Sequence, residues 1–191
     1  MSRLLTAGLA VLALLLSGCG GNAEAVDPNN GGQFRFVEGT PSGLLIPPVD
    51  RGRAPEFGGA LLDDTEFDSA TLAGDIAVIN FWGSWCAPCR VEAEEFQEVY
   101  ADVAAEGVSF LGINVKDSKQ FARAFVRNKE LTYPSIFDPR GEVGLAFREF
   151  PPSAIPSTIL LDRSGRVAAV YLGIVAQDDL RAVLDTLLAE P

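Results

Sequence analysis

Two cysteines separated by Ala87 and Pro88 are the residues of this chain best suited to covalent chemistry. They follow an apolar run at residues 76–81 and open a segment rich in Glu, Ala and Val, a pattern that predicts a strand leading directly into a helix. The free N–H groups at a helix start favour a thiolate on Cys86, and the thiolate is the attacking form of cysteine. Because Cys89 lies one turn further on the same side, it can resolve a mixed disulfide. The pair therefore predicts thiol–disulfide exchange.

Three other uses of the cysteine pair are weaker. A structural disulfide across so short a loop removes little chain entropy. A zinc site needs further ligands, but the chain has no histidine and only one other cysteine, Cys19. Two inert core thiols are also possible, but the N-terminus described below predicts export to an oxidising compartment, where a nearby cysteine pair does not stay reduced. The absence of histidine also excludes Ser-His-Asp and Cys-His catalysis. We therefore expect no metal and no cofactor beyond the redox-active Cys86–Cys89 disulfide.

The composition limits the partners of the chain. With 191 residues, 48% of them hydrophobic, the chain can form one folded domain with extensions. Its 15 basic and 26 acidic residues give a formal net charge of −11. An acidic surface repels phosphate backbones, so we expect no nucleic acid partner.

The N-terminus predicts export and a membrane anchor. Arg3 precedes a mostly apolar run at residues 4–16, which suits a signal peptide better than a membrane-spanning helix. The run ends in Leu16-Ser17-Gly18-Cys19, which resembles the bacterial lipobox. This resemblance implies that residues 1–18 are removed and that Cys19 is lipidated, placing the protein on the extracytoplasmic side of the cell membrane. An ordinary secretory signal that contains a cysteine, or a poor membrane helix, is the alternative.

The segment that follows is rich in loop signals such as Asn29-Asn30-Gly31-Gly32 and Pro47-Pro48. We expect residues 19–55 to form a tether and residues 56–191 to form the folded domain. Part of the tether, at residues 34–37, could add a short strand to that domain.

The body of the chain alternates expected strands and helices. Strands are predicted at residues 76–81, 108–115 and 133–137 and, as a hairpin around residues 162–165, at 157–161 and 167–173. Helices are predicted at residues 89–105, 118–129, 142–147 and 177–189. Parallel pairing early and antiparallel pairing late predict an α/β fold, with a mixed central sheet and helices on both of its faces.

Two stretches resemble the thioredoxin superfamily. Asn80-Phe81-Trp82-Gly83-Ser84-Trp85-Cys86-Ala87-Pro88-Cys89 looks like its active-site segment, and Ala154-Ile155-Pro156-Ser157-Thr158 looks like its cis-proline loop. The similarity covers roughly residues 57–190. It is greatest to the ResA/TlpA-like membrane-anchored branch, whose central insert matches the helix at 118–129 and the segment after it. The resemblance implies a thioredoxin-like fold with this insert.

The same resemblance implies how substrates bind. It predicts a cis bond between Ile155 and Pro156, which turns the backbone of Ile155 toward Cys86, where it can pair with a substrate strand. Trp85 is expected to be a partly exposed wall of the cleft, and Trp82 to serve mainly in packing. The implied partners are proteins that carry disulfides or thiols, for example an apocytochrome c, together with a thiol-transferring membrane protein that returns the pair to its reduced form.

The chain also departs from thioredoxin. Asn80 replaces a buried aspartate and Gly112 replaces a lysine, so that proton-handling pair is absent. In the ResA-like branch a glutamate three residues after the second cysteine takes the role, and Glu92 stands there. The alternative is that Glu92 is one more solvated charge, like Glu94 on the same helix.

The expected function is thiol–disulfide exchange with protein substrates in the reducing direction, with Cys86 as the exposed nucleophile and Cys89 shielded. A disulfide-forming oxidase is the first alternative. A peroxidase of the peroxiredoxin type would want a threonine where Gly83 stands. A binding or chaperone module that uses the Ile155–Pro156 edge without turnover is the third.

Overall fold

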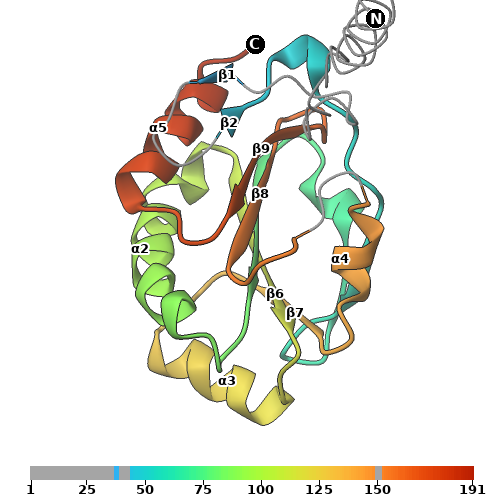
Figure 1. The fold of residues 1–191 in the computed structure, drawn as a ribbon, viewed down its shortest axis with the longest axis vertical. Coiled ribbons are helices and arrows are strands. Elements are labelled where there is room, and N and C mark those ends of the chain that lie inside the picture. The colour runs from blue at the N-terminus through green and yellow to red at the C-terminus, as the bar shows by residue number, and fades with distance from the viewer. Residues whose placement is uncertain (1–36, 39–43, 149–151) are drawn as a thin grey trace, which may run out of the picture. The chain divides into compact units, whose positions relative to one another are not determined.

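The computed structural model describes residues 37–38, 44–148 and 152–191 of the chain. Its centre is a seven-stranded sheet in the order β1-β2-β9-β8-β5-β6-β7 (Figure 1). The strands are β1 (Val37–Glu38), β2 (Leu44–Leu45), β5 (Ile76–Trp82), β6 (Val108–Val115), β7 (Ser135–Asp138), β8 (Ser157–Leu161) and β9 (Val167–Leu172). The pairs β5–β6 and β6–β7 are parallel, and the other neighbours are antiparallel. The mixed sheet is therefore confirmed.

Helices cover both faces of this sheet, as predicted (Figure 1). One face packs against α2 (Ala87–Val103), α3 (Lys119–Asn128) and α5 (Gln177–Leu188). The other packs against α4 (Glu142–Ala146) and the 3₁₀ helix η2 (Ser69–Leu72). Two further 3₁₀ helices are η1 (Pro48–Asp50) and η3 (Ala104–Glu106). Segment α3–β7 is the insert expected from the resemblance.

Strand β5 shows why this arrangement places the site. All of its residues are buried, and they alternate between the two cores: Val78 and Trp82 face α2, whereas Ile79 and Phe81 face the opposite side. Asn80 is the polar residue of this strand and is buried. It pairs with Gly112 of β6 and Thr158 of β8.

The hairpin of β8 and β9 follows the prediction. The side chain of Asp162 accepts hydrogen bonds from the backbone N–H groups of Ser164 and Arg166, and Gly165 supplies the left-handed residue of the turn at φ 70°. A ribbon of β3 (Gly58–Ala60) and β4 (Glu66–Asp68) was not predicted. Strands of three residues are too short for an alternating pattern to be seen.

The folded body starts earlier than the expected boundary at residue 55. Strand β2 pairs with β9, and Ile46 is fully buried. The Arg51 side chain, also buried, donates to the carbonyl of Ile46 at 2.8 Å and to the carboxylates of Asp162 at 3.2 Å and Glu190 at 2.6 Å. Arg51-Gly52-Arg53 looks like a loop, but its arginine is a buried ion-pair partner. The predicted signal peptide, Cys19 and most of the predicted tether lie outside the described residues.

Candidate active site

The two cysteines lie at the start of α2 and form a disulfide. Cys86 is the N-cap, and the backbone N–H of Cys89 donates to its sulfur at 3.2 Å. A helix N-terminus and a direct N–H donor both stabilise negative charge on this sulfur. The local geometry thus favours a thiolate on Cys86 once the bond is reduced.

Exposure does not separate the two cysteines. Cys86 is 3% exposed and Cys89 is 2% exposed, so the expected contrast between an exposed and a shielded cysteine is not seen in the disulfide-bonded protein. The Ile155 carbonyl lies 3.7 Å from the Cys86 sulfur and helps to cover it. The N-cap position, rather than exposure, distinguishes Cys86.

The loop before β8 confirms the predicted cis peptide bond between Ile155 and Pro156. Pro156 is buried, and its carbonyl accepts from the N–H of Gly173 at 2.9 Å. The loop after β9 therefore supports the cis-proline loop. The Ile155 backbone faces Cys86 at the start of β8, as the resemblance implied.

Glu92 lies inside the protein, so the alternative of a solvated charge is wrong. It is 1% exposed, and its carboxylate accepts from the Asn80 amide at 2.9 Å and from the Val175 N–H at 2.9 Å. Burial raises the pKa of Glu92 from 4.5 to about 7, against the opposing effect of these two donors, and the charge of Glu95 adds to the rise. A carboxyl group with such a pKa can both take and give a proton near neutral pH.

Asn80 connects Glu92 to the strand that follows the cis-proline loop. Its amide donates to Thr158, two residues after Pro156, at 3.1 Å as well as to Glu92. Asn80 cannot titrate, but as a donor it fixes the position of the carboxylate. The sequence did not indicate this role, or that of the Val175 N–H, which lies 83 residues from Glu92 in the chain.

Gly112 shows why the thioredoxin lysine has no place here. A Cβ atom at this position would lie 2.3 Å from the Ser135 hydroxyl and 2.6 Å from the Trp82 indole nitrogen. Both side chains are buried and fill the space that a larger residue would need. The departure at Gly112 is thus part of the packing of this site.

Asp117 fixes the loop that leads to Cys86. Its carboxylate accepts from the Ser84 N–H at 2.7 Å and from the Ser84 hydroxyl at 2.9 Å. Burial opposes ionisation, but hydrogen bonds from Asn114, Ser84 and Ser118 outweigh it and lower the pKa of Asp117. Ser118 caps α3, and Asp117 links the β6–α3 loop to the active-site loop.

The two tryptophans divide as predicted. Trp82 is buried and stacks on Phe125 with ring centroids 4.7 Å apart. Trp85 is 50% exposed, and its indole N–H donates to the Val115 carbonyl at 3.2 Å. Among the described residues, no group of three or more potential metal ligands lies close together.

Comparison with known proteins agrees with this geometry. The model of the AhpC/TSA family matches residues 51–170. The thiol-disulfide oxidoreductase ResA of Geobacillus thermodenitrificans is 30% identical over 134 residues, which cover 70% of this chain and 75% of that protein.

Two solved structures share the fold over nearly their whole length. A DsbF homologue from Corynebacterium diphtheriae is 36% identical with a TM-score of 0.72, covering 80% of this chain and 98% of its own. A secreted thiol-disulfide isomerase from Corynebacterium glutamicum is 35% identical with a TM-score of 0.74, covering 82% and 99%.

Proposed function

The chain belongs to the AhpC/TSA family and is a thiol-disulfide oxidoreductase of the ResA type, and we propose that it reduces protein disulfides outside the cytoplasm from a lipid anchor. The observation that carries the proposal is the arrangement of Cys86 at a helix N-terminus, the cis-proline loop above it and the buried Glu92 one helical turn beyond Cys89. The expected substrate is the oxidised haem-binding cysteine pair of an apocytochrome c. A thiol-transferring membrane protein would return the pair to its reduced form.

The proposed reaction has two exchange steps. The Cys86 thiolate attacks one sulfur of the substrate disulfide, and the other substrate sulfur leaves and takes up a proton. Glu92 as a carboxylate then accepts the proton of Cys89, whose thiolate attacks the Cys86 sulfur and releases the second substrate thiol. Two electrons pass from the cysteine pair to the substrate, and Cys86 and Cys89 end as a disulfide. No cofactor takes part in these steps.

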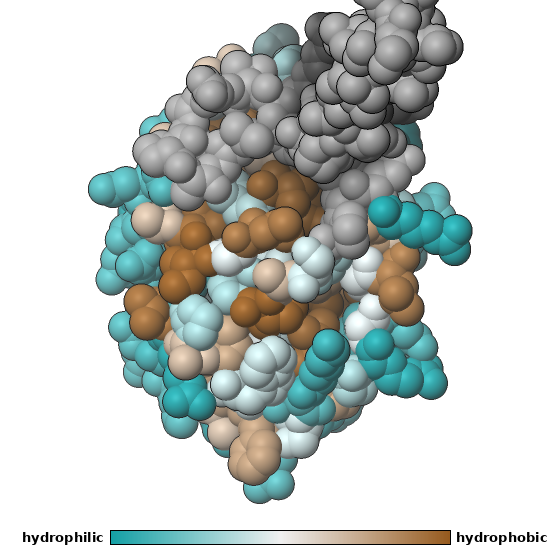
Figure 2. Space-filling model, in the orientation of Figure 1, coloured by the Kyte–Doolittle hydropathy of each residue, from teal (hydrophilic) through white to brown (hydrophobic). Residues whose placement is uncertain are grey.

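The surface around the site suits a protein substrate. Figure 2 shows apolar side chains gathered at the centre of the face that carries the ends of β8 and β9, within a polar margin. Exposed apolar residues next to the site include Trp85, Leu172 and Ile174. Apolar surface beside the Ile155 backbone favours an extended peptide over a small polar molecule.

A peroxidase is disfavoured by the packing of Gly83. A Cβ atom at this position would lie 2.5 Å from the indole nitrogen of Trp85. The threonine that a peroxiredoxin-type site requires would therefore displace Trp85 from its bond to Val115.

Disulfide formation or rearrangement in exported proteins is the second candidate. The observation in its favour is the similarity to the isomerase from Corynebacterium glutamicum, which is higher in identity than that to ResA. Both candidates use the same cysteine pair: disulfide formation reverses the direction of electron flow, and rearrangement transfers no net electrons.

A peptide containing an oxidised Cys-x-x-Cys-His motif tests the proposed reaction. We expect the reduced protein to open the peptide disulfide while Cys86 and Cys89 become oxidised. Alkylation of the free thiols and mass spectrometry measure both changes. The control is the same protein already oxidised. If the reduced protein leaves the peptide disulfide intact, while the oxidised protein closes the reduced peptide, the oxidase alternative is favoured. If the protein exchanges disulfides with the peptide in neither direction, the alternative of a binding or chaperone module is favoured.

The anchor is tested separately at Cys19. In the part of the chain that the structure describes, no helix is long and apolar enough to span a bilayer. If the Leu16-Ser17-Gly18-Cys19 motif directs lipidation, Cys19→Ala should move the protein from the membrane fraction to the soluble fraction, because two or three acyl chains, at about 0.8 kcal/mol per buried methylene, hold a protein stably at a bilayer. Thiol exchange by the released protein should match wild type. Salt-resistant membrane association of the variant would contradict lipid anchoring through Cys19.

A further inference from the structure

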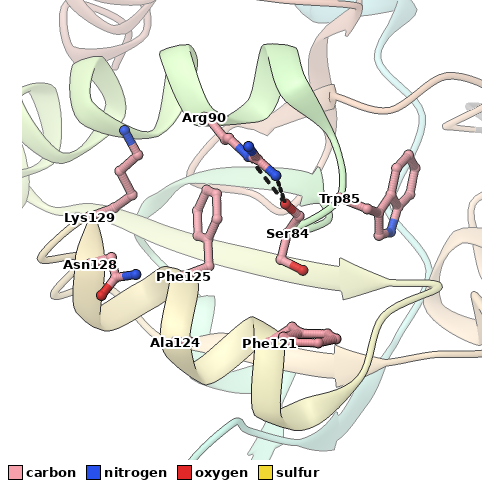
Figure 3. A pocket seen from close by; sticks show the side chains of 8 residues that line it. All are labelled: Ser84, Trp85, Arg90, Phe121, Ala124, Phe125, Asn128 and Lys129. Atoms are coloured by element: carbon pink, nitrogen blue, oxygen red, sulfur yellow. Dashed lines mark hydrogen bonds between the residues drawn. The ribbon is translucent and has the colours of Figure 1, made fainter.

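A groove of about 480 Å³ runs beside the redox pair, between the first turns of α2 and helix α3 (Figure 3). It is lined by Ser84, Trp85, Arg90, Phe121, Ala124, Phe125, Asn128 and Lys129. Phe125 is largely buried against Trp82, whereas Phe121 is 64% exposed and Trp85 is 50% exposed. The groove thus offers aromatic side chains that this chain itself leaves partly uncovered.

The charge of the groove is opposite to that of the protein. Its charged lining residues are Arg90 and Lys129, both cationic, in a chain with a net charge of −11. Helix α3 itself contains three basic residues and no acidic one. Lys129 pairs with Glu94 at 2.5 Å. Arg90 instead donates to the Ser84 carbonyl at 3.0 Å, and within residues 44–148 and 152–191 no carboxylate forms an ion pair with it.

The groove is continuous with the active site along the chain. Ser84 and Trp85 directly precede Cys86, and Arg90 directly follows Cys89. A peptide whose sulfur is bonded to Cys86 therefore has its neighbouring residues within reach of this groove.

We propose that the groove binds an acidic segment with an apolar side chain, adjacent to the reactive cysteine of the protein substrate. This rests on the proposed function, because the substrate must first present its sulfur to Cys86. The apolar side chain would pack against Phe121 and Trp85, and a carboxylate would meet the unpaired charge of Arg90. Charge complementarity of this kind selects partners and speeds their approach. A recess beside the disulfide can hold a peptide side chain, whereas binding to an anionic lipid surface would require a flat face of the protein.

Two single-cysteine peptides test the inference. Both carry one leucine and an activated cysteine bonded to 2-thiopyridine, and they differ only in two glutamates or two lysines next to the leucine. Attack by Cys86 on the peptide sulfur forms the mixed disulfide and releases 2-thiopyridone, whose absorbance gives the rate. Each rate is divided by that of the same protein with 2,2′-dipyridyl disulfide, a neutral small probe. This division removes any change in the cysteine itself.

The glutamate peptide is expected to react faster, by about fivefold in low salt, although the net charge of the protein alone predicts the reverse. Arg90→Glu should bring the ratio of the two peptides below one. Phe121→Ala should slow both peptides relative to the neutral probe. Two matched controls lie at α4, which covers the opposite face of the sheet. Arg140→Glu, just before α4, makes the same charge change, and Leu145→Ala, within α4, removes a similarly exposed apolar side chain. Both should keep the wild-type ratio.

Equal rates for the two peptides, or a preference that Arg90→Glu and Arg140→Glu reduce alike, would overturn the inference. The inference is also overturned if wild type binds vesicles that contain anionic lipid, Arg90→Glu does not bind them, and the peptide ratio of Arg90→Glu stays as in wild type. These results differ from a failure of the proposed function, in which the reduced wild-type protein would leave the disulfide of the oxidised Cys-x-x-Cys-His peptide intact while still reacting with 2,2′-dipyridyl disulfide.

Discussion

Replacing Cys89 by serine is expected to stop the reaction at a covalent complex with the substrate, whereas replacing Cys86 is expected to abolish attack altogether. Cys86 is the N-cap of α2 and accepts the N–H of Cys89, so it is the sulfur whose thiolate the fold stabilises. Without Cys89 the active site has no second thiol to resolve the mixed disulfide, and alkylation of the free peptide thiol prevents the reverse reaction. Exchange in Cys86→Ser should fall by several orders of magnitude, because the remaining Cys89 sulfur does not have the N-cap position.

The measurement is mass spectrometry of each variant after mixing with an oxidised Cys-x-x-Cys-His peptide, without added thiol. Cys89→Ser should accumulate one peptide per protein, and the bond should map to Cys86. Cys86→Ser should accumulate almost none, and the double variant gives the background. Accumulation on Cys89 in Cys86→Ser, at a rate similar to the other variant, would show that the two roles are reversed.

Replacing Glu92 by glutamine is expected to change how the stability of the protein depends on pH. Folding raises the pKa of this carboxyl from 4.5 to about 7, mainly through burial. The folded state therefore holds the proton more tightly than the unfolded state does. The resulting stabilisation is fully present below pH 4.5 and is lost as the pH rises to about 7. The difference in pKa corresponds to about 3 kcal/mol, since one unit is worth about 1.4 kcal/mol.

Denaturant unfolding of the disulfide-bonded proteins at several pH values measures this effect. From pH 5 to pH 8, wild type should lose about 2 to 3 kcal/mol relative to Glu92→Gln, because a small part of the stabilisation is already lost at pH 5. Glu98→Gln, an exposed substitution on the same helix, should follow wild type. A constant difference between wild type and Glu92→Gln over this range would show that Glu92 ionises without a folding penalty.

The same substitution should separate the two exchange steps. Removing the negative charge of Glu92 lowers the cysteine pKa values, because thiolates then form without a nearby carboxylate. Removing the proton acceptor slows release from the mixed disulfide. Thiolate absorbance during a pH titration and the rate of the second step follow these two effects. Unchanged values in Glu92→Gln would leave water as the proton acceptor.

The predictable part of the site is contiguous in sequence. Cys86 and Cys89 indicate a redox pair by their spacing at a helix start, and the Ile155–Pro156 loop is a short motif. The hairpin turn could be predicted because Asp162 and Gly165 act within four residues of chain. The resemblance to the ResA-like branch supplied Glu92, but not its hydrogen-bond partners.

The remainder depends on contacts between distant segments. Val175 donates to Glu92 from the other end of the domain, and Arg51 pairs with residues 111 and 139 positions away. Nothing in a local pattern distinguishes a buried arginine in Arg51-Gly52-Arg53 from a solvated one. The exposure of Cys86 was also beyond prediction, because Ile155 covers it only once the cis-proline loop is in place.

The reduction potential of the Cys86–Cys89 pair tests the central claim most directly. Equilibration with glutathione or dithiothreitol buffers, followed by alkylation, gives its value. We expect a potential near that of thioredoxin, about −270 mV, because a reductant of protein disulfides must give up its electrons readily. Every 30 mV is worth about 1.4 kcal/mol in this two-electron couple, so the outcomes are well separated. A value near −120 mV, that of the strong oxidant DsbA, would contradict the reductant role.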